Sequence, residues 1–349
     1  MLQRSAANPL IQPKAVSPSQ PGFEVIGTFN AGAALYQDKI VLLVRVAERP
    51  IARGNGIIAC PHLGQDGMLT ITEVHRNDPH YDTTDPRQVT HRASGRLLLT
   101  SISHLRLAHS EDGIHFSVDT LPWLPPANYA EAFGVEDARI TRIEDTYYIN
   151  YSAVSAHGIA TALASTTDFV TFERHGVIFP PANRDVTLLP RRINGLYACY
   201  HRPMPGYFGG YNIWYATSPD LIHWGNHQLV MESEGTDWAA GRVGGGAPPL
   251  ETAEGWLSIY HAADRQQRYC LGAFLTAPDE PQRIIRRSRG PILTPEARYE
   301  REGFFANVVF SCGVVQHGDL LRIYYGAADE SIALAEVSTQ ALLTDLQPV

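Results

Sequence analysis

The sequence predicts an all-β protein, specifically a five-bladed β-propeller with a central pocket, and two observations carry this prediction. Glycine (29) and proline (24) are plentiful and evenly spread over the 349 residues, whereas long helical periodicity is scarce. The start of one strand pattern also recurs five times: an apolar-aromatic strand, a strand of small residues, a turn of Ser/Asp type and a short strand with an aromatic residue. Evenly repeated four-stranded units are typical of β-propellers, in which neighbouring units bury each other's faces.

The strands are expected in the same order in every repeat. The apolar-aromatic strand is expected at residues 38–45, 145–152, 194–200, 254–260 and 318–325. The small-residue strand is expected at residues 105–113, 162–169, 213–220, 269–273 and 332–335. In the first three repeats the short third strand follows, with Phe116, Phe172 and Trp224. A two-sheet sandwich is the alternative, but the Ser-x-Asp turn that recurs before an aromatic residue favours the propeller.

The chain is expected to form one domain with a short extension. Residues 1–22 are polar and rich in Pro, Ser and Gln, so we expect an N-terminal extension there and a single propeller domain over residues 23–349. The extension is expected either to be a disordered tail or to pack against a neighbouring subunit. A homo-oligomer therefore stays open as an expectation.

Composition excludes several classes of protein. With 44% hydrophobic residues the chain has a globular composition, and its net charge of −8 argues against non-specific binding of nucleic acid. No apolar run approaches the roughly 20 residues that span a bilayer, and the N-terminus lacks the apolar stretch of a secretory signal. We therefore expect no membrane partner and a cytoplasmic location. The four cysteines are far apart and the 14 histidines form no metal motif, so neither a disulfide framework, nor a metal site, nor a bound cofactor is expected.

Residues 133–139 are the most informative stretch of the chain. They place two adjacent carboxylates, Glu136 and Asp137, and then Arg139 just before the strand-like run 140–154. Adjacent side chains on a strand point to opposite faces, so one of the two carboxylates is expected to be enclosed. A single enclosed carboxylic acid beside an arginine suits acid catalysis on a sugar.

Polar residues recur at equivalent places of the five repeats, as a central ligand pocket requires. Each of them alone could be a structural group, for example an arginine paired with its neighbour, but their recurrence in five units favours a shared pocket. The candidates are Asn30, Arg45, Glu136, Asp137, Arg139, Arg184, Asp185, His201, Arg202, Arg242, His261 and Asp329.

Other chemistries lack their motifs. The chain has no G-x-S-x-G nucleophile elbow and no P-loop. The glycines at 244–246 are followed by Pro248 and Pro249, which do not allow the helix start of a dinucleotide fingerprint. These glycines are expected to bring the backbone close to a ligand or to make a tight turn.

Residues 134–139 resemble the Gly-x-Glu-Asp-Pro-Arg signature of glycoside hydrolase family 130, five-bladed propellers that act on β-mannosides. The similarity covers nearly the whole chain from about residue 23 and includes residues 183–186, 201–203, 242–249, 255–261, 307–310 and 324–329. Residues 99–108, which include His104 and Arg106, look most like the branch acting on β-1,2-linked mannosides. Two departures are Ala138 in place of the usual proline and Ala262 in place of a frequent glycine.

The resemblance implies an inverting phosphorylase, in which inorganic phosphate replaces the base and water of an inverting glycosidase. Asp137 would be the general acid, with a pKa raised by burial or by Glu136, and its proton would pass through a sugar hydroxyl. Phosphate would be the co-substrate, and the implied products are α-mannose 1-phosphate and a shortened manno-oligosaccharide. The implied sugar contacts are Asn30, Arg45, Glu136, Arg139, His104, Asp185 and Asp329. The implied phosphate contacts are Arg184, Arg202, His261, Arg106 and Arg242.

Two rival functions and one local question stay open at this point. A β-1,2-mannosidase of the same fold is the first rival, but residues 244–249 contain no carboxylate that would activate water. A catalytically silent sugar-binding propeller is the second. Linkage and chain-length preference depend on loops such as 50–96. Tyr207, Phe208 and Tyr211 are expected to form a platform for a sugar, or else to be core or oligomer contacts.

Overall fold

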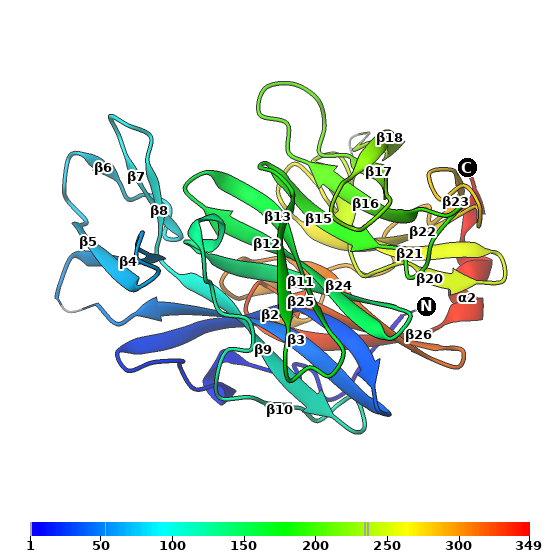
Figure 1. The fold of residues 1–349 in the computed structure, drawn as a ribbon. Coiled ribbons are helices and arrows are strands. Elements are labelled where there is room, and N and C mark those ends of the chain that lie inside the picture. Colours follow the sequence, from blue (N-terminus) through cyan, green and yellow to red (C-terminus); the bar gives the residue numbers. More distant parts are fainter. Residues whose placement is uncertain (1, 53, 234, 236) are drawn as a thin grey trace.

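The computed structural model describes residues 2–52, 54–233, 235 and 237–349, and these residues form a mostly β fold with four short helices. The all-β prediction is confirmed. The strands fall into five successive antiparallel groups, four of which are built mainly from consecutive strands (Figure 1). In the order in which the strands pair, the predicted apolar-aromatic strands are the second strand of each group, and the predicted small-residue strands are the third.

The first group consists of β2 (Phe23–Tyr36), β3 (Lys39–Pro50), β9 (Ile102–Ser110) and β10 (Ser117–Val118). The second consists of β11 (Gly134–Ile143), β12 (Thr146–Ser155), β13 (Gly158–Thr166) and β14 (Glu173–Phe179). A parallel bridge from Gly134 to Ser103 joins these two groups into one sheet. The third consists of β15 (Asn183–Leu188), β16 (Tyr197–Pro203), β17 (Ile213–Ser218) and β18 (Gly225–Met231).

The fourth group consists of β19 (Arg242–Gly245), β20 (Leu250–Thr252), β21 (Gly255–Ala263), β22 (Tyr269–Thr276), β23 (Ile284–Arg287) and the C-terminal β27 (Gln347–Pro348). The fifth consists of β24 (Val309–His317), β25 (Leu320–Ala327), β26 (Ser331–Ser338) and the N-terminal β1 (Gln3–Arg4). The helices are two 3-10 turns, at Pro13–Ala15 and Tyr129–Glu131, and the α-helices α1 (Arg298–Arg301) and α2 (Thr339–Asp345).

An insertion between β3 and β9 forms two small sheets of its own. The first pairs β4 (Ile57–Leu63) with β5 (Leu69–His75). The second contains β6 (Tyr81–Asp82), β7 (Gln88–His91) and β8 (Leu97–Leu99). Figure 1 shows these strands projecting from the body of the molecule, at the left of the view.

Hydrophobic clusters lie between successive groups and explain why each group folds only with its neighbours. Separate clusters join the first group to the second, the second to the third, the third to the fourth and the fourth to the fifth. A further cluster joins the fifth group back to the first, through residues such as Leu42, Val44, Tyr324 and Leu334. All four cysteines are buried and free, as small apolar residues would be. No helix among the described residues is long and apolar enough to cross a membrane.

The Ser/Thr-x-Asp turns that mark the repeats have a direct hydrogen-bonding role. Asp112 accepts hydrogen bonds from the backbone amides of residues 114 and 115, and Asp220 does the same for residues 222 and 223. Asp168 accepts from residues 170 and 171. Each carboxylate therefore satisfies two backbone donors in a tight turn, which is the reason for aspartate at this place.

The N-terminal segment is not a disordered tail, because its described residues pack on their own domain. Its packing against a neighbouring subunit stays a prediction. β1 pairs with β26, and Ile11 forms a bridge with Ile332. The Arg4 guanidinium binds the fully buried carboxylate of Glu300, with Nε 2.8 Å from Oε1, and Tyr325 donates a hydrogen bond to the same oxygen at 2.7 Å. The segment is therefore part of the fold, held by a partly buried ion pair.

We expect Arg4→Ala to lower the free energy of unfolding by roughly 3 kcal/mol, because it leaves a buried carboxylate without its cation. Burial alone would raise the pKa of Glu300, but Arg4 and backbone amides hold it below its usual value. This stabilisation is therefore present at neutral pH and is lost as the pH falls through the native pKa of the carboxyl group. Urea unfolding at pH 7 and at about pH 4 measures both effects.

The exposed Arg49, which pairs with exposed Glu24, provides the matched control. Arg49→Ala should change the unfolding free energy by less than about 1 kcal/mol, since exposed pairs contribute little. Equal effects of the two substitutions would contradict the structural role of Arg4.

Candidate active site

Three predicted site residues share an unusual backbone conformation on the first strand of their groups. Asn30, Asp137 and Asp185 have positive φ angles of 48°, 51° and 56°. Each lies where the strand loses register with its neighbour: between Phe29 and Gly32, between Glu136 and Arg139, and between Arg184 and Thr187. Such bulges redirect a side chain, and positive φ is unfavourable for these residues unless the surrounding fold enforces it. The repeated bulge directs the three side chains into one cavity.

Most of the predicted residues line this single cavity of about 340 Å³. The predicted lining residues are Asn30, Arg45, Asp137, Arg184, Asp185, Arg202, Arg242, His261 and Asp329. They come from all five groups, which is the convergence that the recurrence of polar residues predicted.

Asp137 is enclosed, as expected, and arginine and asparagine hold it. The Asn30 amide donates to Oδ1 at 3.0 Å, and Arg45 Nη1 donates to the same oxygen at 3.0 Å. Arg45 also donates from Nη2 to Glu136 Oε1 at 2.7 Å, and Arg184 donates to Glu136 Oε2 at 2.6 Å. Glu136 is therefore occupied by two arginines and is not the partner of Arg139.

The expected rise in the pKa of Asp137 is wrong for this form of the protein. Burial alone would raise that pKa, but Arg45, Arg184 and Arg139 together with Asn30 lower it below the usual value. The raised carboxyl group is Asp329, because burial brings its pKa to about 6, partly offset by Arg45. Two carboxyl groups of one cavity thus have pKa values shifted in opposite directions, and Asp329 takes up a proton at a higher pH than Asp137.

Asp185 anchors a second charged cluster deeper in the site. Arg139 Nη2 donates to its Oδ1 at 3.0 Å, Arg202 Nε donates to its Oδ2 at 2.6 Å, and His261 Nε2 lies 3.4 Å from Oδ2. Burial alone would raise the pKa of Asp185, but Arg202, His261 and Arg139 hold it well below its usual range. For His261 burial has the opposite effect and lowers the pKa, so this imidazole is neutral at pH 7.

Arg139 has a structural position, although the resemblance implied a sugar contact. Its side chain is 1% exposed and it is absent from the cavity wall. Besides Asp185, it donates to the carbonyl oxygens of Asp137, Gly245 and Gly246. It therefore ties the bulge of Asp137 to the third and fourth groups and fixes the backbone at this residue.

The cavity contains buried donors that lack a partner among the described residues. They are Arg184 Nε, Arg202 Nη1, Arg242 Nε and the one nitrogen of the neutral His261 ring that carries a hydrogen. The Arg242 guanidinium is held between two aromatic rings, 5.1 Å from the ring centre of Tyr211 and 5.6 Å from that of Tyr269. Buried polar groups are rarely left unpaired, and convergent N–H donors of this kind suit an oxyanion. The arrangement is that of an anion site beside an enclosed carboxylate.

The glycines at 244–246 allow close packing of protein against protein. A Cβ atom on Gly244 would lie 2.5 Å from His261 Cε1 and 2.7 Å from Asp185 Oδ2. A Cβ atom on Gly245 would lie 2.7 Å from the Asp185 carbonyl oxygen. The expectation of a close backbone approach thus holds, but the groups approached are the site residues themselves.

His104 and Arg106, implied as contacts for sugar and phosphate, lie outside the cavity. Both side chains are buried against Glu48: Arg106 Nη2 lies 2.8 Å and His104 Nε2 lies 3.0 Å from Glu48 Oε1. Ser19 also donates to this carboxylate, and Arg106 donates to the Ser17 carbonyl oxygen. This cluster ties the N-terminal segment to β3 and β9, because alternate residues of β9 face away from the cavity.

Several residues of the cavity wall were not predicted as site residues. They are Arg87, Gln267, Tyr269, Phe305, Val308 and Phe310. Val308 and Phe310 belong to one of the motifs that carry the resemblance, so a signal existed for them. Arg87 comes from the inserted sheet, and no periodicity of the sequence marks it.

The three aromatic residues of loop 204–212 lie in two different environments. Tyr211 stacks on Arg202 and Arg242 and so belongs to the surroundings of the site. Tyr207 and Phe208 are 95% and 84% exposed and contact each other with ring centres 5.7 Å apart. The structure therefore excludes the core interpretation for these two.

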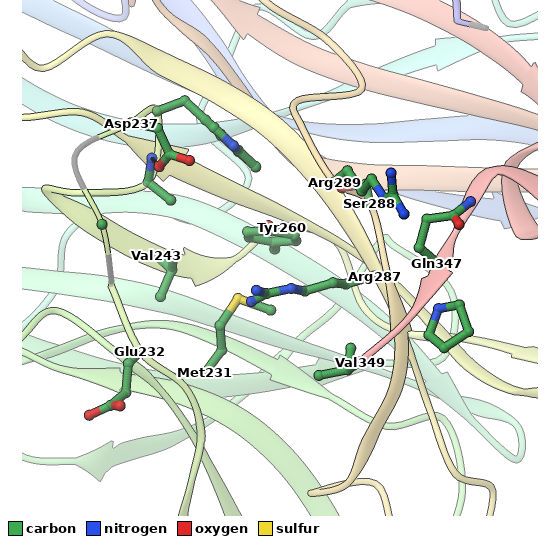
Figure 2. Close-up of a pocket in the computed structure, with 14 residues that line it drawn as sticks. Met231, Glu232, Asp237, Val243, Tyr260, Arg287, Ser288, Arg289, Gln347 and Val349 are labelled. Atoms are coloured by element: carbon green, nitrogen blue, oxygen red, sulfur yellow. Dashed lines mark hydrogen bonds between the residues drawn. The ribbon is translucent and has the colours of Figure 1, made fainter.

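A larger cavity of about 540 Å³ lies elsewhere and shares no described residue with the first. Figure 2 shows it between the end of β18, β23 and the C-terminal strand, with Met231, Tyr260 and Arg287 in its wall. None of the predicted site residues lines it. Size alone therefore does not identify the functional site, whereas the convergence of carboxylates and unpaired donors does.

Comparison with known proteins finds related phosphorylases. Residues 83–347 match the family model of glycoside hydrolase family 130, described as β-1,4-mannooligosaccharide phosphorylase. The chain is 44% identical over 349 residues to a β-1,2-mannobiose phosphorylase of Listeria innocua, covering 99% of this chain and 98% of the relative. It is 39% identical over 237 residues to a 1,2-β-oligomannan phosphorylase of Thermoanaerobacter sp., covering 67% of this chain and 78% of the relative.

A solved structure extends the similarity to three dimensions. The Listeria innocua β-1,2-mannobiose phosphorylase in complex with β-1,2-mannobiose superposes with a TM-score of 0.94 at 43% identity, covering 99% of this chain and 98% of that chain. The family model spans the cavity residues from Arg87 onward, whereas Asn30 and Arg45 precede its first matched residue. The chain belongs to glycoside hydrolase family 130.

Proposed function

We propose that the protein is an inverting β-mannoside phosphorylase that acts on β-1,2-linked manno-oligosaccharides and releases α-mannose 1-phosphate. The observation that carries the proposal is the set of unpaired buried donors on Arg184, Arg202, Arg242 and His261 beside the enclosed Asp137. A hydrolase needs a carboxylate to activate water, whereas a phosphorylase needs a cationic pocket for phosphate. The names of the relatives with 44% and 39% identity support the β-1,2 linkage.

In the proposed reaction a phosphate oxygen attacks C1 of the terminal mannosyl unit, and the bond from C1 to the glycosidic oxygen breaks. The leaving oxygen takes a proton that originates from Asp137 and passes through a hydroxyl group of the sugar. Asn30, Arg45 and Asp329 lie around Asp137 and would bind the mannosyl unit. Attack from the face opposite to the leaving group inverts the configuration at C1, so the product is the α-phosphate.

The low pKa of Asp137 imposes a condition on this mechanism. In the free protein Arg45 and Arg184 favour the carboxylate form, so Asp137 must gain a proton before it acts as an acid. A phosphate anion that binds the unpaired donors would compete for the positive charge of Arg184 and so raise the pKa of Asp137. We propose that phosphate binding prepares the acid as well as supplying the nucleophile.

We also propose that the five groups form a five-bladed propeller around this cavity. The clusters between successive groups, including the one between the fifth and the first, support a ring arrangement. In a ring, the first strand of each group faces the centre, which fits the shared cavity of Asn30, Asp137 and Asp185.

Phosphate dependence tests the proposed reaction. With β-1,2-mannobiose and inorganic phosphate, we expect equal amounts of mannose and α-mannose 1-phosphate, whose anomer NMR identifies. Without phosphate, the rate should fall to background, because water lacks the contacts that position the nucleophile. A sulfate solution of the same ionic strength controls for salt. Mannose release at the same rate without phosphate would establish the hydrolase instead, and binding without turnover would establish a sugar-binding protein.

A further inference from the structure

The inserted sheet contributes Arg87 to the cavity wall. Neither the strand repeats nor the family motifs indicate this arginine. Arg87 lies just before β7 and lines the cavity together with Asp137 and Asp329. Asp85 holds its guanidinium in a fork, with Oδ1 3.0 Å from Nε and Oδ2 2.8 Å from Nη2. The same carboxylate accepts from the Arg87 backbone amide at 2.9 Å. The orientation of Arg87 is therefore defined within the insertion itself.

The insertion is fixed to the strand that carries the proposed acid. Val89 and Leu98 of the inserted sheet pack in one cluster with Phe133 and Val154 of the second group. The Leu63 amide also donates to the Ala132 carbonyl oxygen at 2.8 Å. Arg87 therefore has a defined position relative to Asp137, as a specificity-determining side chain requires.

An aromatic residue from a different part of the chain, Phe305, packs against Arg87 at the cavity wall. The Arg87 guanidinium carbon lies 5.2 Å from the ring centre of Phe305, and Phe305 lies between α1 and β24. The Phe305 amide donates to the carbonyl oxygen of Ala328, the neighbour of Asp329. Gln267, between β21 and β22, lines the same cavity. A guanidinium stacked on a ring, with an amide nearby, offers an apolar plane and several N–H donors.

The position of Arg87 and Phe305 relative to the anion site decides which sugar of the substrate these two residues contact. The side chain of Arg87 is 50% exposed, whereas those of Arg202 and His261 are 4% and 1% exposed. The anion site is thus deep, and the pair of Arg87 and Phe305 lies toward solvent. In an inverting displacement the nucleophile and the leaving group occupy opposite faces of the reacting sugar. The leaving sugar consequently extends away from the anion donors and toward the solvent side of the cavity.

We propose that Arg87 and Phe305 bind the sugar next to the reacting mannosyl unit, which is the leaving group of phosphorolysis and the acceptor of the reverse reaction. Phe305 contacts the C–H face of this sugar, and Arg87 donates to its hydroxyl groups. This inference rests on the proposed phosphorolysis. It assigns acceptor specificity to Arg87 of the insertion together with Phe305, which lies between α1 and β24.

The reverse reaction separates the two sugars, because α-mannose 1-phosphate is the donor and free mannose is the acceptor. We expect Arg87→Ala to raise the KM for mannose about tenfold, which corresponds to the loss of roughly 1.4 kcal/mol of binding. The KM for α-mannose 1-phosphate should change less than about twofold, because its contacts lie elsewhere. Phe305→Ala should also raise the KM for mannose. Because the two side chains touch, the double variant should raise this KM by less than the product of the two single effects.

Two further variants make the experiment decisive. Arg92→Ala is the matched control: Arg92 is on the same insertion, 57% exposed, contacts Tyr81 and Asp82 and is absent from the cavity wall. It should leave both constants unchanged. Asp85→Asn keeps Arg87 but weakens the fork that orients it, so it should raise the KM for mannose alone. If Arg87→Ala proves unstable in thermal unfolding, Asp85→Asn carries the test.

The outcomes distinguish this inference from the function on which it rests. If the unmodified protein forms no mannose 1-phosphate, the proposed function is wrong and this inference falls with it. If the unmodified protein is active but Arg87→Ala and Asp85→Asn leave the KM for mannose unchanged, only the inference is overturned. An equal rise in both Michaelis constants would place Arg87 at the donor and overturn it as well.

Discussion

Asp137→Asn is expected to lower kcat for phosphorolysis of β-1,2-mannobiose by roughly 10²–10⁴-fold, the usual contribution of a general acid. The amide has nearly the shape of the carboxyl group, so the bulge that places residue 137 in the cavity should persist. It has no acidic proton, however, so the glycosidic oxygen would have to leave as an alkoxide. Steady-state kinetics measure the loss, and calorimetry with mannobiose measures whether sugar binding survives.

The matched control is Asp145→Asn on the same group. Asp145 is fully exposed and lies 3.5 Å from Arg142, so its loss should leave kcat within about twofold. A substrate with a good leaving group, such as an aryl β-mannoside, needs less help from an acid and should be less affected by Asp137→Asn. An Asp137→Asn protein with most of its activity would rule Asp137 out, and Asp329, with its pKa of about 6, would become the next candidate.

The second large effect is expected at Arg202, which links the proposed phosphate donors to Asp185. Arg202→Ala removes an unpaired buried Nη1 and the Nε that binds Asp185 at 2.6 Å. Loss of one charge-assisted hydrogen bond to phosphate should lower kcat/KM for phosphate by roughly 10- to 100-fold. The KM for mannobiose should change little. Initial rates over a matrix of phosphate and mannobiose concentrations separate the two constants.

Two companion variants test the geometry of this effect. Arg202→Lys keeps the charge but not the planar fork, so it should recover only part of the loss. Arg191→Ala removes an exposed arginine of the same group, paired with Glu251, and should leave both constants unchanged. Because Asp185 keeps Arg139 at 3.0 Å, thermal unfolding should show that Arg202→Ala still folds. A loss confined to mannobiose would contradict the phosphate role.

Much of the fold was predictable because the strands carry local signals. The second and third strands of each group alternate aromatic and small residues, and an aspartate in the following turn satisfies two backbone amides within three residues. Such interactions act over short sequence distances, so the sequence shows them directly. The N-terminal segment was not predictable in this way, because Arg4 finds its partner at Glu300, almost at the other end of the chain.

The sequence predicted most of the residues of the candidate site, but it predicted fewer of the contacts that these residues make. Polar side chains at equivalent places of the repeats pointed to Asn30, Asp137, Asp185 and Asp329, and the cavity contains all four. The bulges that aim three of them inward depend on register with neighbouring strands, which no local pattern encodes. His104 and Arg106 show the reverse case: their residue types suited a ligand site, but their strand presents them to the buried Glu48.

The amino-acid sequence by itself determined the all-β class, the repeated order of the strands, the membership in glycoside hydrolase family 130 and the candidate acid. These properties follow from local patterns and from motifs of a few residues. Only the tertiary structure decided which carboxyl group has a raised pKa, which arginines keep free donors and which part of the insertion reaches the cavity. A pKa depends on charges and burial contributed by segments far apart in the chain. Asp137 and Asp329 are both aspartates in family motifs, and Arg45 and Arg184 lower the pKa of both. They differ because folding places hydrogen bonds from Asn30 and Arg45 on Asp137, whereas the negative charges of Asp137 and Glu136 raise the pKa of Asp329.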